Sequence, residues 1–127
     1  MKDRHLFRGK RIDNGIWEEG FHICDKFHSY IGTCAPHFDE YDNLCIEHNF
    51  EVDPKTIGQC TGLKDTNGTL IFEGDICIGD NGKKTEIVFA DYNFRHRILG
   101  DIHCNSISYL WVDMYSIEVV GNIHEDN

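Results

Sequence analysis

The stretch Gln59–Ile76, QCTGLKDTNGTLIFEGDI, constrains the fold of this chain more than any other. Two short apolar runs flank the dipeptide Asn67-Gly68, and a second turn signal, Glu73-Gly74-Asp75, follows at once. Asn-Gly between strand-like runs is the strongest short-range signal for a β-hairpin, because the tight turn needs residues that tolerate positive φ. The stretch therefore predicts a hairpin that leads directly into the next strand.

Short predicted strands separated by glycine-bearing turns continue on both sides of this hairpin. Asn14-Gly15 predicts a second β-hairpin within residues 6–24, and Gly79-Asp80-Asn81-Gly82 predicts a further turn. The other predicted strands are Cys45–Val52, Thr56–Cys60, Asp75–Ile78, Lys84–Ala90, Arg95–Ile102, Ser106–Val112 and Ser116–Val120. Strands of this length and spacing are typical of an all-β fold with little helix, whose C-terminal part forms a small barrel.

Val52-Asp53-Pro54 marks the boundary between two predicted subdomains. Proline fixes its own φ and keeps the preceding residue out of helical space, and Asp53 can cap the turn that follows. Residues 1–53 then form an N-terminal β subdomain with the hairpin and an irregular acidic region, and residues 54–127 form the C-terminal barrel subdomain. We expect Trp17, Tyr109 and Trp111 to belong to the core rather than to a ligand-binding face.

Length and composition predict a cytoplasmic protein that folds by itself. A chain of 127 residues with 40% hydrophobic residues can bury a core. No apolar run approaches the roughly 18 residues that a membrane span requires, and the N-terminus lacks the apolar region of a signal peptide. In the cytoplasm the six cysteines are expected to remain reduced thiols rather than a disulfide framework.

The net charge of −10 is unevenly distributed along the chain. Residues 1–11 carry five basic residues and one acidic residue, a net charge of +4, which leaves −14 for residues 12–127. Because an acidic body repels phosphate backbones, we do not expect nucleic acid to be a partner unless the basic N-terminal segment binds it. The interpretation we favour for that segment is a leading strand whose cations pair with acidic groups.

Cys34, His37, Cys45 and His48 form the clearest group of residues with metal-ligand chemistry. They make two Cys-x2-His pairs, and thiolate and imidazole groups are the ligands of tetrahedral zinc sites. The spacing is not that of a standard zinc finger, and a chain with eight histidines and six cysteines contains such pairs by chance. We therefore predict no metal and no other cofactor, and keep these four residues as an alternative zinc site.

No pattern in the sequence predicts an enzyme. None of the twelve glycines falls in a dinucleotide-type or Walker-type phosphate-binding motif. Asp65 and Asp75 could be interpreted as paired catalytic carboxylates, but each lies beside a turn residue, where a carboxylate accepts hydrogen bonds from nearby backbone N–H groups. We therefore predict structural roles for both residues and assign no catalytic residue.

Three segments of the chain together resemble the YopX family of small bacteriophage and prophage proteins. The central one contains TGLKD at 61–65, NG at 67–68 and IFEGDI at 71–76, while FRGK at 7–10 is similar to the family's opening and EVVGNIH at 118–124 to its end. The resemblance spans nearly the whole chain, although Cys60, His124 and residues 25–50 depart from it. It implies an all-β fold with a C-terminal SH3-like barrel, and it carries over no catalytic residue.

These observations together predict a phage or prophage accessory protein that acts by binding in the host bacterial cytoplasm, away from membranes. Its partner would be another protein or a second copy of itself, and the acidic body favours a basic partner surface. One alternative is a nucleic-acid-binding SH3-like barrel that uses the basic N-terminal segment. A further alternative is a zinc-stabilised module or an enzyme.

Overall fold

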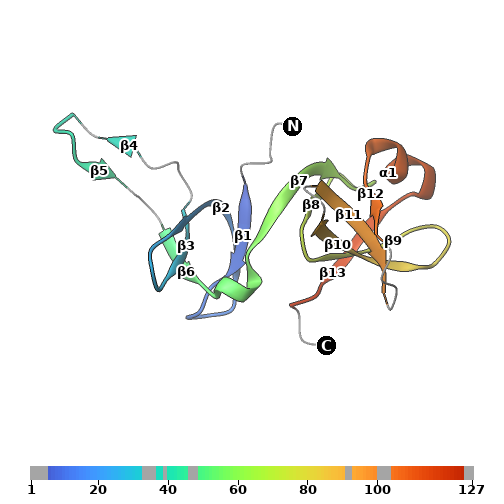
Figure 1. The fold of residues 1–127 in the computed structure, drawn as a ribbon, viewed down its shortest axis with the longest axis horizontal. Coiled ribbons are helices and arrows are strands. Elements are labelled where there is room, and N and C mark those ends of the chain that lie inside the picture. Colours follow the sequence, from blue (N-terminus) through green and yellow to red (C-terminus); the bar gives the residue numbers. More distant parts are fainter. Residues whose placement is uncertain are drawn as a thin grey trace. The chain divides into compact units, whose positions relative to one another are not determined.

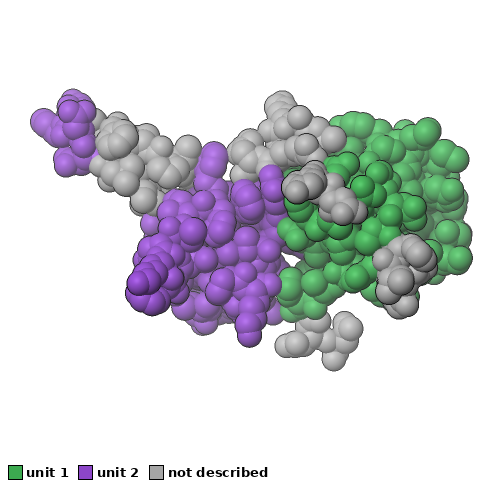
Figure 2. All heavy atoms as spheres, viewed as in Figure 1, with its two compact units in different colours: residues 1–3, 60–127 green, residues 4–59 purple. Residues whose placement is uncertain are grey.

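The computed structural model of the protein describes residues 6–32, 37–38, 40–45, 49–90, 93–99 and 104–124, with only the backbone of residues 37–38 and 44–45. The chain forms two compact units (Figure 2). Unit 2 is Arg4–Gln59, and unit 1 consists of Met1–Asp3 and Cys60–Asn127. Antiparallel strands make up most of both units (Figure 1), so the predicted all-β class is confirmed.

Unit 2 is an antiparallel sheet in the order β6-β3-β2-β1-β7. Its strands are β1 (Phe7–Lys10), β2 (Trp17–Cys24), β3 (Ser29–Gly32) and β6 (Asn49–Val52), and the first two residues of β7 (Gly58–Lys64) pair with β1. The two-residue strands β4 (His37–Phe38) and β5 (Leu44–Cys45) pair with each other. The Asn14-Gly15 turn joins β1 to β2, which confirms the N-terminal hairpin.

A 3-10 helix, η1 (Pro54–Thr56), lies at the predicted boundary. Asp53 caps η1 as predicted, because its side chain accepts a hydrogen bond from Lys55 N at 3.0 Å. The Thr56 hydroxyl accepts a hydrogen bond from Lys10 N at 2.8 Å and donates one to Asp53 O at 2.6 Å. These bonds join the end of β1 to the segment that leads into β7. The two compact units divide after Gln59, within β7.

The approach of β2 to β3 requires glycine at position 20. Gly20 is buried on β2, and a Cβ atom there would overlap the carbonyl oxygen of Gly32, which belongs to the backbone of β3. Backbone atoms cannot move aside as the end of a flexible side chain can. The central pair of strands in unit 2 therefore tolerates no side chain at this position.

We predict that Gly20→Ala destabilises unit 2 by about 4 kcal/mol or more, because β2 and β3 must separate to admit the methyl group. Urea unfolding followed by Trp17 fluorescence in a Trp111→Phe background measures the change in the free energy of unfolding. Gly15→Ala is the matched control, because Gly15 has φ +72° in open surroundings and substitution there costs only about 1 kcal/mol. Equal effects of the two substitutions would contradict the proposed steric constraint.

Unit 1 contains a five-stranded antiparallel sheet in the order β12-β11-β10-β9-β13. The strands are β9 (Asp75–Ile78), β10 (Lys84–Ala90), β11 (Asn93–Ile98), β12 (Asn105–Ser106) and β13 (Glu118–Asn122). The rest of β7 pairs with β8 (Leu70–Phe72), and the helix α1 (Tyr109–Tyr115) precedes β13. The core joins strands and helix through Leu63, Ile71, Cys77, Ile87, Val112 and Ile117.

The central hairpin has the predicted turns and the predicted roles for both aspartates. Gly68 and Gly74 have φ values of +83° and +91°. Asp65 is buried, and its Oδ1 accepts hydrogen bonds from Asn67 N and Thr69 N, while its Oδ2 accepts one from Val119 N on β13. Asp75 Oδ2 accepts a hydrogen bond from Phe72 N at 2.7 Å. Both carboxylates are therefore structural.

The prediction of a strand over Ser106–Val112 is wrong. Strand β12 ends at Ser106, and the helix α1 begins at Tyr109. Ser108 caps this helix, because its side chain accepts a hydrogen bond from Trp111 N at 3.2 Å. Tyr109, which was predicted to be in the core, is 62% exposed. At seven residues α1 is far too short to cross a membrane, and the described residues contain no other helix that could do so.

The other strand predictions differ from the structure mainly at their ends. Strands β9 and β10 have the predicted bounds. The strand predicted over Arg95–Ile102 is β11, which begins two residues earlier and ends at Ile98. The one predicted over Thr56–Cys60 begins at Gly58 and continues to Lys64, because η1 occupies the preceding residues. Of the segment Cys45–Val52, residues 46–48 lie outside the described part of the chain.

We predict that Asp65→Ala lowers the free energy of unfolding of unit 1 by about 3 kcal/mol, because three backbone N–H groups lose their acceptor. Trp111 fluorescence during urea unfolding, in a Trp17→Phe background, measures the change. Asp13→Ala serves as the control, since the Asp13 side chain is 60% exposed and its ion pair with Arg11 lies at the surface. A loss for Asp65→Ala no greater than that for the control would refute the structural role.

Candidate functional site

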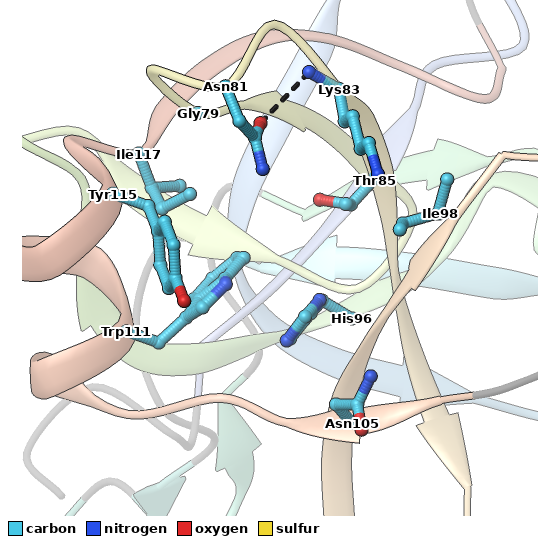
Figure 3. A pocket seen from close by; sticks show the side chains of 10 residues that line it. All are labelled: Gly79, Asn81, Lys83, Thr85, His96, Ile98, Asn105, Trp111, Tyr115 and Ile117. Carbon is cyan, nitrogen blue, oxygen red and sulfur yellow. Dashed lines mark hydrogen bonds between the residues drawn. The ribbon is translucent and has the colours of Figure 1, made fainter.

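Unit 1 contains a pocket of about 370 Å³ between the β10–β11 hairpin and α1 (Figure 3). The β9–β10 turn, the strands β10 to β12, the helix α1 and the residue before β13 all contribute to its lining. The lining residues are Gly79, Asn81, Lys83, Thr85, His96, Ile98, Asn105, Trp111, Tyr115 and Ile117. A concave site with apolar walls and a few convergent polar groups is the usual form of a binding pocket.

The pocket has a buried floor and an exposed rim. Thr85 and Ile117 are buried, with 8% and 3% of their surface exposed, and His96 and Trp111 are half-buried. Asn81, Lys83, Ile98, Asn105 and Tyr115 are exposed and surround the opening. A ligand would therefore meet carboxamide and ammonium groups first and the hydroxyl and imidazole groups last.

The strand register and the helix together position the floor. Thr85 lies opposite Ile98 and Ile87 lies opposite His96, so Thr85 and His96 are diagonal neighbours on one face of the β10–β11 pair. The Trp111 ring, presented by α1, stacks on the His96 ring with a centroid distance of 4.4 Å and an interplanar angle of 13°. The imidazole is thus held between its strand and the helix.

The β9–β10 turn is attached to the end of α1. Asp80 N donates a hydrogen bond to Tyr115 O at 2.8 Å, and Asn81 Oδ1 accepts one from Lys83 N at 3.0 Å. A Cβ atom at Gly79 would lie 3.3 Å from both Tyr115 O and a methyl group of Ile117, so the turn packs closely on this end of the helix. This packing fixes the Asn81 side of the rim.

Two buried polar atoms of the floor have no hydrogen-bond partner: Thr85 Oγ1 and His96 Nδ1. They are consequently not hydrogen-bonded to each other. Burial of His96 lowers its pKa below the ordinary value of 6.5, so the neutral imidazole is favoured at neutral pH. An unsatisfied buried polar group costs about 1–3 kcal/mol, and such a group at the floor of a pocket indicates a place where a ligand can supply the missing hydrogen bond.

The described lining residues of the pocket are mostly neutral. They include no carboxylate and no thiol, and the Thr85 hydroxyl is not hydrogen-bonded to the His96 imidazole. Lys83 is the one charged group among them. The pocket offers neutral hydrogen-bonding groups at its floor, aromatic and aliphatic walls, and a single cation at its rim.

The outer face of α1 lies beside this pocket and carries exposed apolar side chains around the exposed carboxylate of Asp113. Tyr109, Leu110 and Met114 are 62%, 67% and 59% exposed, whereas Val112 on the inner face is buried. Leu110 and Met114 are four residues apart, so they lie together on the helix surface. Tyr115, which is 41% exposed, connects this face to the pocket rim.

The four residues kept as an alternative zinc site fall largely outside the described structure. Cys34 and His48 lie outside the described residues, and of His37 and Cys45 only the backbone is described. The backbones of His37 and Cys45 lie opposite each other in the β4–β5 pair. No group of three or more potential metal ligands occurs among the side chains that the structure describes. The alternative zinc site stays a prediction.

Two cations of the N-terminal segment, Arg8 and Arg11, lie against aromatic or acidic groups. Arg11 forms ion pairs with Asp13 at 2.7 Å and Glu18 at 3.4 Å, and its guanidinium lies 4.3 Å from the centre of the Phe50 ring. The guanidinium of Arg8 lies over the Trp17 ring at 5.0 Å. The cysteines Cys24, Cys60, Cys77 and Cys104 are not joined in disulfides.

Thr85, His96 and Asn81 were not predicted to be site residues. One signal was present, because Thr85 shares the inward-facing row of β10 with the buried Ile87. A hydroxyl in a core-facing position needs a partner, and that requirement indicates a buried network or a ligand site. The helix α1 provides Trp111 and Tyr115 to the pocket. Because a strand was predicted over Ser106–Val112 in place of this helix, the pocket could not be recognised from the sequence.

The fold and the pocket together define a class: a small protein of antiparallel sheets with a largely neutral, partly aromatic pocket beside a helix that exposes apolar side chains. The family model described as YopX protein matches residues 6–127. The chain therefore belongs to the YopX family, as its sequence motifs suggested. Among curated proteins the search found no match.

Two histidines are expected to titrate on opposite sides of the ordinary pKa of 6.5. The hydrogen bond from His28 Nδ1 to Glu51 at 2.9 Å, together with the charge of Glu51, raises the pKa of His28, whereas burial lowers that of His96. The stabilisation from His28 is complete below pH 6.5 and is lost as pH rises through its folded-state pKa. The contribution of neutral His96 is present above pH 6.5 and is lost as pH falls through its folded-state pKa.

NMR titration of the histidine Cε1–H signals, assigned with His28→Gln and His96→Gln variants, tests both directions. We predict a midpoint above 6.5 for His28 and below 6.5 for His96. Glu51→Gln should move only the His28 midpoint, towards 6.5. A His96 midpoint at or above 6.5 would contradict a buried, neutral imidazole at the pocket floor.

Proposed function

We propose that this YopX protein acts by binding another protein, without catalysis, and that the outer face of α1 with the adjacent pocket is its contact surface. The family resemblance supports a role as an accessory protein of a bacteriophage or prophage in the cytoplasm of the host bacterium. The C-terminal unit would then serve as a recognition module, as SH3-like barrels do.

The observation that carries this proposal is the exposure of Tyr109, Leu110 and Met114 on one short helix. Tyrosine and methionine are enriched in the cores of protein interfaces, because they provide a large contact area at low cost in conformational entropy or with adaptable shape. With Leu110 between them in the sequence, Tyr109 and Met114 place three exposed apolar side chains on one helix next to a pocket, around the exposed Asp113. Such a group differs from the isolated exposed apolar residues that every protein has.

Charge favours a different protein with a basic rim over a second copy of this chain. Asp113 lies on α1, and Asp80 is hydrogen-bonded to its C-terminal end. Two copies that met face to face through α1 would bring these carboxylates together, on a chain whose net charge is already −10. A partner with an apolar centre and basic residues around it would instead be attracted.

The nucleic-acid alternative has less support. Arg11 is engaged by Asp13 and Glu18, and Arg8 lies over Trp17, so these described cations of the N-terminal segment have neighbours within unit 2. Phosphate binding normally needs several free cations along one path. The pocket supplies a single one, Lys83.

Photo-crosslinking in host cells tests the proposal. A benzoylphenylalanine residue in place of Leu110 should form an adduct with a second protein, whereas the same group in place of Ile16, which is 55% exposed in unit 2, should not form that adduct. With the partner purified, we predict that the double variant Leu110→Ser, Met114→Ser weakens the binary complex at least about tenfold. Binding should also weaken between 50 and 500 mM salt, as expected for a basic rim.

The double variant Ile12→Ser, Ile16→Ser is the matched control, since both residues are exposed apolar residues of unit 2. It should leave the dissociation constant unchanged. The proposal fails if both double variants weaken the complex equally, if the adduct at position 110 contains only copies of this chain, or if no adduct forms there. Light scattering after gel filtration detects the self-associated form directly.

A further inference from the structure

We propose that the pocket beside α1 receives a tyrosine side chain of the partner protein, whose phenol hydroxyl is hydrogen-bonded by Thr85 and His96 at the floor. This inference rests on the proposed protein-binding function and names the group that the partner inserts. It follows from the two unpartnered polar atoms of the floor, the apolar walls above them and the neutral carboxamides of the rim.

The floor needs one small group that both donates and accepts hydrogen bonds. Thr85 Oγ1 can donate or accept, and the Nδ1 of a neutral imidazole accepts when its proton is on Nε2. As diagonal neighbours across two strands, these residues have Cβ atoms about 7 Å apart, which leaves room for one oxygen atom between their polar ends. A phenol hydroxyl can donate to His96 Nδ1 and accept from Thr85 Oγ1, so that all three groups are satisfied.

The walls fit an aromatic ring. Figure 3 shows the Thr85 hydroxyl directed into the space that Trp111, Tyr115 and His96 border. Ile117 adds a buried aliphatic surface, and the volume of about 370 Å³ is ample for one six-membered ring and its hydroxyl. Aromatic rings contribute beyond the area that they bury when they meet other rings edge-on or offset.

The rim can hold the main chain of the residue that enters. The Oδ1 atom of Asn81 is used by Lys83 N, which leaves its carboxamide N–H groups to donate to a partner's carbonyl groups. Asn105, on β12, provides a second carboxamide at the exposed edge of the pocket. The rim therefore offers hydrogen bonds to a peptide backbone.

Other side chains and ligands fit the floor less well. A phenylalanine ring would leave Thr85 Oγ1 and His96 Nδ1 unsatisfied, and a tryptophan N–H would donate without accepting. A carboxylate at the floor would be buried without a cation beside it, which is costly. A nucleotide would bring a phosphate to a rim that carries one cation on an acidic protein.

Three small probes test the site on the full-length protein: N-acetyl-tyrosinamide, N-acetyl-phenylalaninamide and uridine monophosphate. Dissociation constants come from ¹H–¹⁵N NMR titration, with the indole N–H of Trp111 and the side-chain nitrogens of His96 as reporters. We expect the tyrosine probe to bind with a dissociation constant of about 1 mM, to move both reporters, and to bind about threefold to tenfold more tightly than the phenylalanine probe.

Two substitutions of Thr85 separate recognition from structure. Thr85→Val keeps the shape and removes an unsatisfied hydroxyl, so it should fold at least as well as the natural protein. It should also make the tyrosine and phenylalanine probes bind about equally, without lowering the affinity for the phenylalanine probe. Thr85→Ser keeps the hydroxyl and should retain the preference. A purely structural role of Thr85 would change both probes equally.

The inference is overturned if the tyrosine probe causes no pocket shifts at 10 mM, if Thr85→Val keeps the tyrosine preference, or if uridine monophosphate binds the pocket more tightly. The first of these results, combined with a partner complex that still depends on Leu110 and Met114, removes the inference and leaves the proposed function intact. If the tyrosine probe binds selectively but the Leu110 and Met114 substitutions do not affect partner binding, the proposed contact surface on α1 is refuted and the tyrosine site in the pocket stands.

Discussion

The hydrogen bonds of the Asp65 carboxylate hold unit 1 together. One oxygen closes the central hairpin through Asn67 N and Thr69 N, and the other binds Val119 N on the C-terminal strand. The neighbouring Thr66 N donates to Ile117 O, so the same turn fixes the residue before β13, which forms part of the pocket floor. The position of α1, and with it the pocket, thus depends on a turn that contributes no residue to the pocket lining.

Turn residues made much of the fold predictable from the sequence. The requirement for positive φ at Gly15, Gly68 and Gly74 is local and is met by few residue types, so the hairpins and the bounds of β9 and β10 could be predicted without knowledge of tertiary contacts. The local hydrogen bonds of Asp65 Oδ1 and Asp75 Oδ2 were predictable for the same reason, because the N–H groups that they bind are only a few residues away. The bond from Val119 N to Asp65 Oδ2 was not predicted.

The helix and the pocket were not predictable in this way. The alternation of Ile107, Tyr109 and Trp111 with Ser106 and Ser108 indicated a strand, and the N-cap Ser108 was the local sign of the helix that the structure has instead. Thr85 and His96 become pocket residues only through the side chains packed around them. That packing depends on the β10–β11 register and on α1 together.

The bond between Asp65 and Val119 also has a consequence for the order of folding during synthesis. It joins residues 54 apart, and β13 must add to β9 to complete the sheet. Unit 1 therefore cannot close its core until the last strand has left the ribosome, whereas every strand of unit 2 is available once Gln59 has emerged. Because domains form as their sequence becomes available, unit 2 is expected to fold first, while the apolar segments of unit 1 depend on rapid completion of the chain to avoid aggregation.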